Sequence, residues 1–74
     1  MKSSAEYKQL ALEYAGKGQH ERVIACCSEW IRQDPKSPIA YLLRGGSYVS
    51  IGDGVRGLAD MERGKAMMKS GMHQ

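Results

Sequence analysis

The sequence predicts an all-α domain of four helices, and three observations lead to that prediction. Apolar residues recur at spacings of three and four residues along four segments. Glycine- or proline-containing turns separate these segments, whereas β-branched residues are sparse and no run alternates between apolar and polar residues. The 74 residues fit one small domain that buries about 60 % of its unfolded surface. This size excludes a large enzyme scaffold with a deep enclosed cleft.

The first helix should follow Ser3, and the second should begin near His20. Ser3-x-x-Glu6 has the spacing of a capping box, and Gly16-Lys17-Gly18 ends the helix that it opens. The second helix should end at Asp34-Pro35, because proline disfavours helical geometry in the residue before it. The apolar stripes of the two helices are Tyr7, Leu10, Ala11 and Tyr14, and then Val23, Ile24, Cys27, Trp30 and Ile31.

The third helix should open at Ser37-Pro38, where a capping residue precedes proline at the first helical position. After the break at Gly52-Asp53-Gly54, a fourth helix is expected to end near Ser70-Gly71, a C-cap pattern. The apolar stripes are Tyr41, Gly45 and Tyr48, and then Val55, Leu58, Met61, Ala66 and Met68.

The two helix pairs align at an offset of 34 residues. Five identities fall at Tyr7/Tyr41, Tyr14/Tyr48, Gly18/Gly52, Arg22/Arg56 and Ala25/Ala59. The first copy reads Tyr7-x-x-Leu10-Ala11-x-x-Tyr14, then Val23-x-x-x-Cys27 and Pro35, and the second reads Tyr41-x-x-Arg44-Gly45-x-x-Tyr48, then Gly57-x-x-x-Met61. This pattern resembles the tetratricopeptide repeat (TPR) family, with two tandem repeats over about 4–37 and 38–71 of a single domain, 1–74.

The resemblance implies two helix-turn-helix hairpins of antiparallel helices in a short right-handed superhelical stack. The small residues Ala11 and Gly45 would let paired helix axes approach to about 8–10 Å. We expect Trp30, which stands where the family has a small residue, to pack into a notch at Gly45-Gly46. Gly57 and Gly64 replace expected alanines and each cost about 0.5–1 kcal/mol in a helix, so the last helix should be the least stable.

No catalytic, cofactor or metal site follows from the sequence, so we do not expect an enzyme. Cys26 and Cys27 are candidate nucleophiles, but His20 would lie about two turns, or 10 Å, from Cys27, too far for a nucleophile and its base. The two adjacent cysteines with His20 and His73 lack the spaced ligand pairs of a structural zinc site. Cys27 is expected in the core, and Cys26 nearer the edge, where exposure would make it reactive.

The TPR resemblance implies that the first helix of each repeat lines a concave groove. It places Lys8 and Leu12 from the first repeat in that groove, and Ile39, Leu42 and Val49 from the second. This apolar face suits an amphipathic helix or a hydrophobic peptide, but the chain's own termini or a second copy are equally open as its cover. The chain contains no Asn, which argues against a clamp for a terminal carboxylate.

The C-terminal end of the stack should also be uncovered. Repeat proteins need about three repeats and a polar cap, whereas this sequence shows two repeats. Leu58, Met61 and Met68 would then lack a covering helix. We therefore expect self-association, most simply a homodimer, or binding to a larger protein.

Charge and cysteine content complete the functional picture. The net charge of +3 comes from 11 basic and 8 acidic residues without a like-charge run. A basic nucleic-acid-associated protein is the alternative, using Arg44, Arg56, Arg63, Lys65 and Lys69, but we expect no aromatic residues interleaved with these.

The longest apolar run, 23–27, is far too short to span a membrane. Neighbouring cysteines are not readily bridged, so we expect reduced thiols and a cytoplasmic protein.

Overall fold

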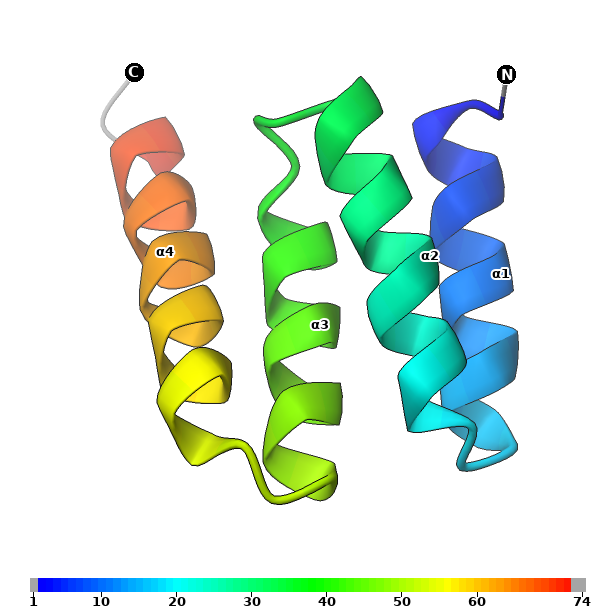
Figure 1. Cartoon of the computed structure of the whole chain (residues 1–74). Coiled ribbons are helices and arrows are strands. Elements are labelled where there is room, and N and C mark those ends of the chain that lie inside the picture. The colour runs from blue at the N-terminus through cyan, green and yellow to red at the C-terminus, as the bar shows by residue number, and fades with distance from the viewer. Residues whose placement is uncertain (1, 73–74) are drawn as a thin grey trace.

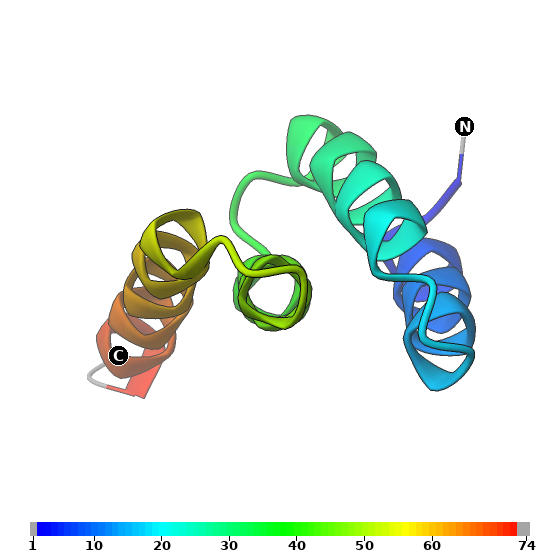
Figure 2. The same cartoon turned by 60° about the horizontal axis from the view of Figure 1, so that its bottom comes forward.

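The structure, a computed structural model, describes residues 2–72 and confirms the all-α fold. The four helices are α1 (Ser4–Gly16), α2 (His20–Gln33), α3 (Pro38–Ser50) and α4 (Gly54–Met72), and they run alternately up and down (Figure 1). In Figure 2 the helices follow an arc, with α1 and α4 at its ends. The predicted helix boundaries are confirmed except at the C-terminus, where the helix continues through Gly71 to Met72.

The turns and caps explain most of these boundaries. Ser3 and Glu6 form the predicted capping box, in which Glu6 N–H donates to Ser3 Oγ at 3.2 Å and Ser3 N–H donates to Glu6 Oε1 at 2.9 Å. These hydrogen bonds lower the pKa of Glu6. Pro38 occupies the first turn of α3, but the Ser37 side chain makes no capping hydrogen bond, contrary to prediction. Asp53 caps α4, since its Oδ1 accepts from Arg56 N–H at 3.2 Å.

The two hairpins have the same local geometry, displaced by 34 residues. The starts of α1 and α3, of α2 and α4, and the ends of α1 and α3 all differ by 34. The two described residues with positive φ are the turn glycines Gly18 (70°) and Gly52 (92°), also 34 apart. Arg22 lies over the Tyr14 ring at 5.8 Å, and Arg56 lies over the Tyr48 ring at 5.9 Å. The sequence identities therefore mark equivalent contacts.

The core lies mainly between α1 and α2 and reaches the start of α3. Its buried residues are Tyr7, Ala11, Val23, Cys26, Cys27, Trp30 and Ala40. Trp30, 2 % exposed, belongs to this cluster. Its predicted packing against Gly45-Gly46 is wrong, because a Cβ at Gly45 would meet Gly57, Asp60 and Met61 of α4, and one at Gly46 would meet nothing within 4 Å.

Glycines bring α3 and α4 close together. A Cβ on Gly57 would lie 2.8 Å from the Gly45 carbonyl oxygen and 2.5 Å from Val49 Cγ2, and one on Gly64 would lie 2.9 Å from Leu42 Cγ. Because glycine has no Cβ, atoms of α3 can approach the α4 backbone at these two positions more closely than any other residue would allow. The sequence led us to count Gly57 and Gly64 only as a loss of helix stability, but they also allow the close packing of the second hairpin.

Candidate protein-binding surfaces

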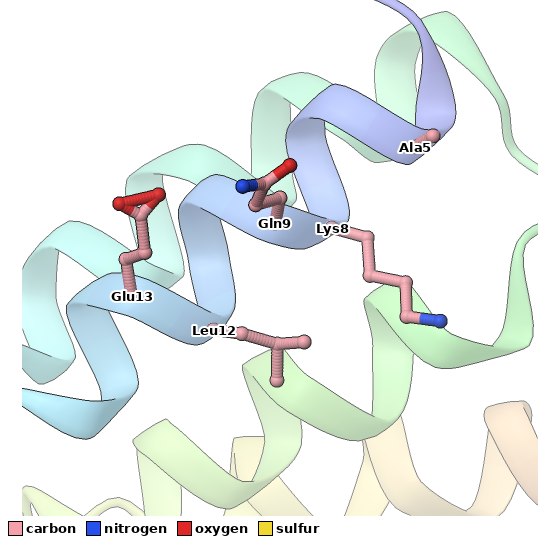
Figure 3. A pocket seen from close by; sticks show the side chains of 5 residues that line it. All are labelled: Ala5, Lys8, Gln9, Leu12 and Glu13. Atoms are coloured by element: carbon pink, nitrogen blue, oxygen red, sulfur yellow. The ribbon is translucent and has the colours of Figure 1, made fainter.

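The first candidate surface, the inner face, consists of Lys8, Leu12, Ile39, Leu42 and Val49. Ala5, Lys8, Gln9, Leu12 and Glu13 of α1 line a hollow of about 450 Å³. Figure 3 shows Lys8 and Leu12 pointing towards the side of α3, and Gln9 and Glu13 pointing away from it. The Leu12 side chain is 48 % exposed. The lining thus combines the apolar side chains of Ala5 and Leu12 with one cation, Lys8, and one carboxylate, Glu13.

The three inner-face residues on α3 do not line that hollow, and they differ in their surroundings. Ile39 and Val49 are 36 % and 46 % exposed, whereas Leu42 is half-buried. Leu42 lies against the α4 backbone at Gly64, and Val49 lies against it at Gly57. The glycines of α4, which sequence reasoning did not connect with the groove, therefore determine where these two side chains lie.

The second candidate surface lies on α4. Leu58 is 61 % exposed and Met68 is 45 % exposed, as expected for residues without a covering helix. Met61 is half-buried instead, because its Cγ lies 2.9 Å from the position of a Cβ on Gly45. Among the described residues, α4 packs on α3 alone. One side of α4 therefore faces solvent along its length.

Besides these two surfaces, the side chain of Arg44 forms hydrogen bonds that connect three helices. Its Nε and Nη2 donate to both carboxylate oxygens of Asp60 at 2.8 and 2.9 Å, and its Nη1 donates to Ser28 Oγ at 3.1 Å. The ion pair raises the pKa of Arg44. Arg44 thereby connects α2, α3 and α4.

Tyrosine rings separate the arginines around this junction. Arg44 and Arg63 lie over Tyr41, each at 5.7 Å, and Arg44 and Arg56 lie over Tyr48, each at 5.9 Å. The expectation that these basic residues lack interleaved aromatics is therefore wrong for the three arginines. It failed because the tyrosines belong to α3 and two of the arginines to α4, so the alternation exists only across the packed helices.

Both thiols are buried. Cys27 is fully buried, and burial raises its pKa to about 12. Cys26 is 9 % exposed, its Sγ lies 3.5 Å from the Tyr7 carbonyl oxygen, and burial raises its pKa as well. The predicted exposure of Cys26 is wrong. A raised pKa keeps each thiol protonated and therefore a poor nucleophile.

Within residues 2–72, no three His, Cys, Asp or Glu side chains gather closely enough to hold a metal ion. His20 Nδ1 is 3.4 Å from Ser47 Oγ, and His73 lies outside the described residues. No helix in the described part of the chain is long and apolar enough to cross a membrane. No protein-family model, curated protein or solved structure matches this sequence.

Proposed function

We propose that this chain is a non-enzymatic protein-binding module of the TPR type that receives a hydrophobic or amphipathic segment of another protein on its inner face. The supporting observation is the exposure of Leu12, Ile39 and Val49, three large aliphatic side chains on the parallel helices α1 and α3. Removing them from water would favour binding by about 25 cal/mol per Å² of apolar area buried.

The arrangement of charge on this face suggests what kind of segment binds. Lys8 is the one ionisable residue among the five of the inner face, and it stands beside the hollow with Leu12. An amphipathic helix with apolar residues three or four positions apart would cover the aliphatic side chains. An acidic residue near one end of that helix would meet Lys8. We also propose a cytoplasmic location, which is consistent with two free buried thiols.

A selection of displayed helical peptides, followed by calorimetry, tests this function. The tightest peptides should carry spaced apolar residues, and Leu12→Glu should weaken them at least tenfold, or about 1.4 kcal/mol, because it places a carboxylate in the apolar contact. Val55→Glu is the matched control, since Val55 is 83 % exposed on α4, away from the inner face. Equal binding by the Leu12→Glu variant and the wild type would reject the inner face.

Nucleic-acid binding is the second candidate, favoured by the arginines stacked on Tyr41 and Tyr48. Two observations weigh against it: Tyr41 is only 6 % exposed, and Arg44 already holds Asp60. Neither group is then free to stack on a base or to bind a phosphate. Binding of a nonspecific oligonucleotide that weakens steeply with salt, and that Arg63→Glu abolishes, would favour this candidate over the first.

A further inference from the structure

The contact between α2 and α3 provides a template for a contact between copies of this chain. On α2, Ser28 accepts from Arg44 and His20 lies 3.4 Å from Ser47, while Trp30 and Ala40 share the core. A displacement of 34 residues converts α2 into α4 and α3 into α1. The face of α2 that contacts α3 therefore recurs on α4, and the face of α3 that receives it recurs on α1. Among the described residues, no helix packs on either of these recurring faces.

Most counterparts of the residues in this contact are exposed, whereas Leu10, the counterpart of Arg44, is half-buried and Gly64, the counterpart of Trp30, is buried. Ala40 and Ser47 of α3 are 0 % and 4 % exposed. Their counterparts on α1 are Glu6 and Glu13, and both are exposed. On α4, the residues corresponding to His20, Ile24, Ser28 and Ile31 are Gly54, Leu58, Glu62 and Lys65, and all four are exposed. We call these residues the outer face of α4, and Glu6, Gln9, Leu10 and Glu13 the outer face of α1.

We propose that a second copy of this chain docks head to tail, with the outer face of its α4 on the outer face of α1. The proposal goes beyond the proposed function, because it concerns the exposed side of α4 rather than the inner face. It leaves the five inner-face residues outside the contact, although Gln9 and Glu13 also line the hollow beside Lys8 and Leu12.

Charge complementarity supports this pairing. In the docked arrangement, Lys65 lies near Glu6, and Glu13 lies at the N-terminus of α4, where the helix dipole favours a carboxylate. Glu62 lies beside Leu10, which shares a hollow of about 390 Å³ with the cations Lys2 and Arg22 and with one carboxylate, Glu29. Helix α4 holds four basic and two acidic residues, whereas α1 holds one basic and two acidic residues. Over the whole helices, pairing α4 with α1 therefore joins opposite net charges, and on the outer faces themselves it brings the single cation Lys65 to a face that carries only the carboxylates Glu6 and Glu13.

The geometry also predicts how the assembly grows. A contact between two different faces leaves one free face at each end, so further copies can add unless the rotation closes a ring. The mean mass of the wild type in light scattering should therefore increase with concentration beyond that of a dimer. It should fall when salt is raised to about 1 M, where the Debye length is about 3 Å.

Disulfide mapping tests the contact directly. The counterparts of Ser47 and His20 are Glu13 and Gly54, and Gly54 has open space where its Cβ would stand. A mixture of Glu13→Cys and Gly54→Cys variants, oxidised with diamide, should give a cross-linked heterodimer. The native thiols are buried and should not compete.

Each variant alone should give no cross-linked dimer, and the control mixture of Lys36→Cys with Gly54→Cys should give none. A cross-linked homodimer of the Gly54→Cys variant would show α4 paired with α4 and would overturn the head-to-tail contact. Wild type that stays monomeric at high micromolar concentration would overturn it too. Either result would leave peptide binding to the inner face, and the effect of Leu12→Glu on it, unchanged.

Discussion

Arg44 is the residue at which the two hairpins differ most in chemistry. Its counterpart in the first hairpin is Leu10, and the counterpart of its partner Asp60 is Cys26, so an apolar pair in one hairpin is an ion pair in the other. The Arg44 and Asp60 side chains are 21 % and 11 % exposed. Two parallel hydrogen bonds fix the orientation of the guanidinium group. Removing one partner would leave a largely buried charge without its counter-ion.

Asp60→Ala should therefore lower the free energy of unfolding by about 2–3 kcal/mol, since the remaining Arg44 keeps its desolvation cost without its partner. Urea denaturation at neutral pH measures the change. The Arg44→Leu/Asp60→Ala variant, which removes both charges, is the control and should recover most of the loss. Equal losses in the single and double variants would show that the ion pair, rather than an unpaired arginine, accounts for the effect.

Helix α4 is placed by small residues rather than by a buried apolar stripe. Gly57 faces the Gly45 carbonyl oxygen and Val49, and Gly64 faces Leu42 and the Pro38 carbonyl oxygen. Where backbone atoms stand this close, a Cβ cannot be accommodated by a change of rotamer. The two helices would have to move apart, and the inner-face side chains Leu42 and Val49 would move with them.

Gly57→Ala should lower the free energy of unfolding by about 1–3 kcal/mol, the usual cost of overpacking, despite its higher helix propensity. Gly46→Ala is the matched control, because Gly46 is also within a helix but its Cβ would meet nothing within 4 Å. In the Gly46→Ala variant, the free energy of unfolding should rise by about 0.5–1 kcal/mol, because alanine reduces the conformational entropy of the unfolded chain. Thermal and urea unfolding measure both. A higher free energy of unfolding in both variants would mean that α3 and α4 are not closely packed at Gly57.

These examples show which features could be predicted from the sequence. Helix boundaries depend on local residues such as Ser3, Pro38 and the turn glycines, so the periodicity and caps predicted them well. Gly71 misled because a C-cap glycine needs positive φ, and among the described residues only Gly18 and Gly52 have it. The place of Trp30 and the proximity of arginines to tyrosines depend on how whole helices pack, which spacing within one helix does not reveal. The repeat pattern was enough to assign Leu12 to an exposed face. The contact between Leu42 and the α4 backbone at Gly64 depends on how two helices pack, so it could not be predicted.

Over the whole molecule, the buried core is unevenly distributed between the two hairpins. Four of its seven residues, namely Val23, Cys26, Cys27 and Trp30, belong to α2, and none of the seven belongs to α4. Helix α2 packs against both α1 and α3, whereas α4 packs on α3 only. In a repeat protein each unit is stabilised mainly by its neighbours, so the helix with one neighbour should open first.

Native-state hydrogen exchange should therefore be fastest in α4 and slowest in α2. The matched segments are residues 57–64 in α4 and 23–30 in α2, which occupy equivalent positions in the two hairpins. After correction for intrinsic rates, amides of 57–64 should exchange at least about tenfold faster, which corresponds to an opening free energy lower by about 1.4 kcal/mol. Concentrations low enough to keep the protein monomeric are required, because docking of α4 on a second copy would protect it. Equal protection of the two segments at low concentration would mean that the four helices unfold as one cooperative unit, and that packing on α3 alone does not make α4 less stable than α2.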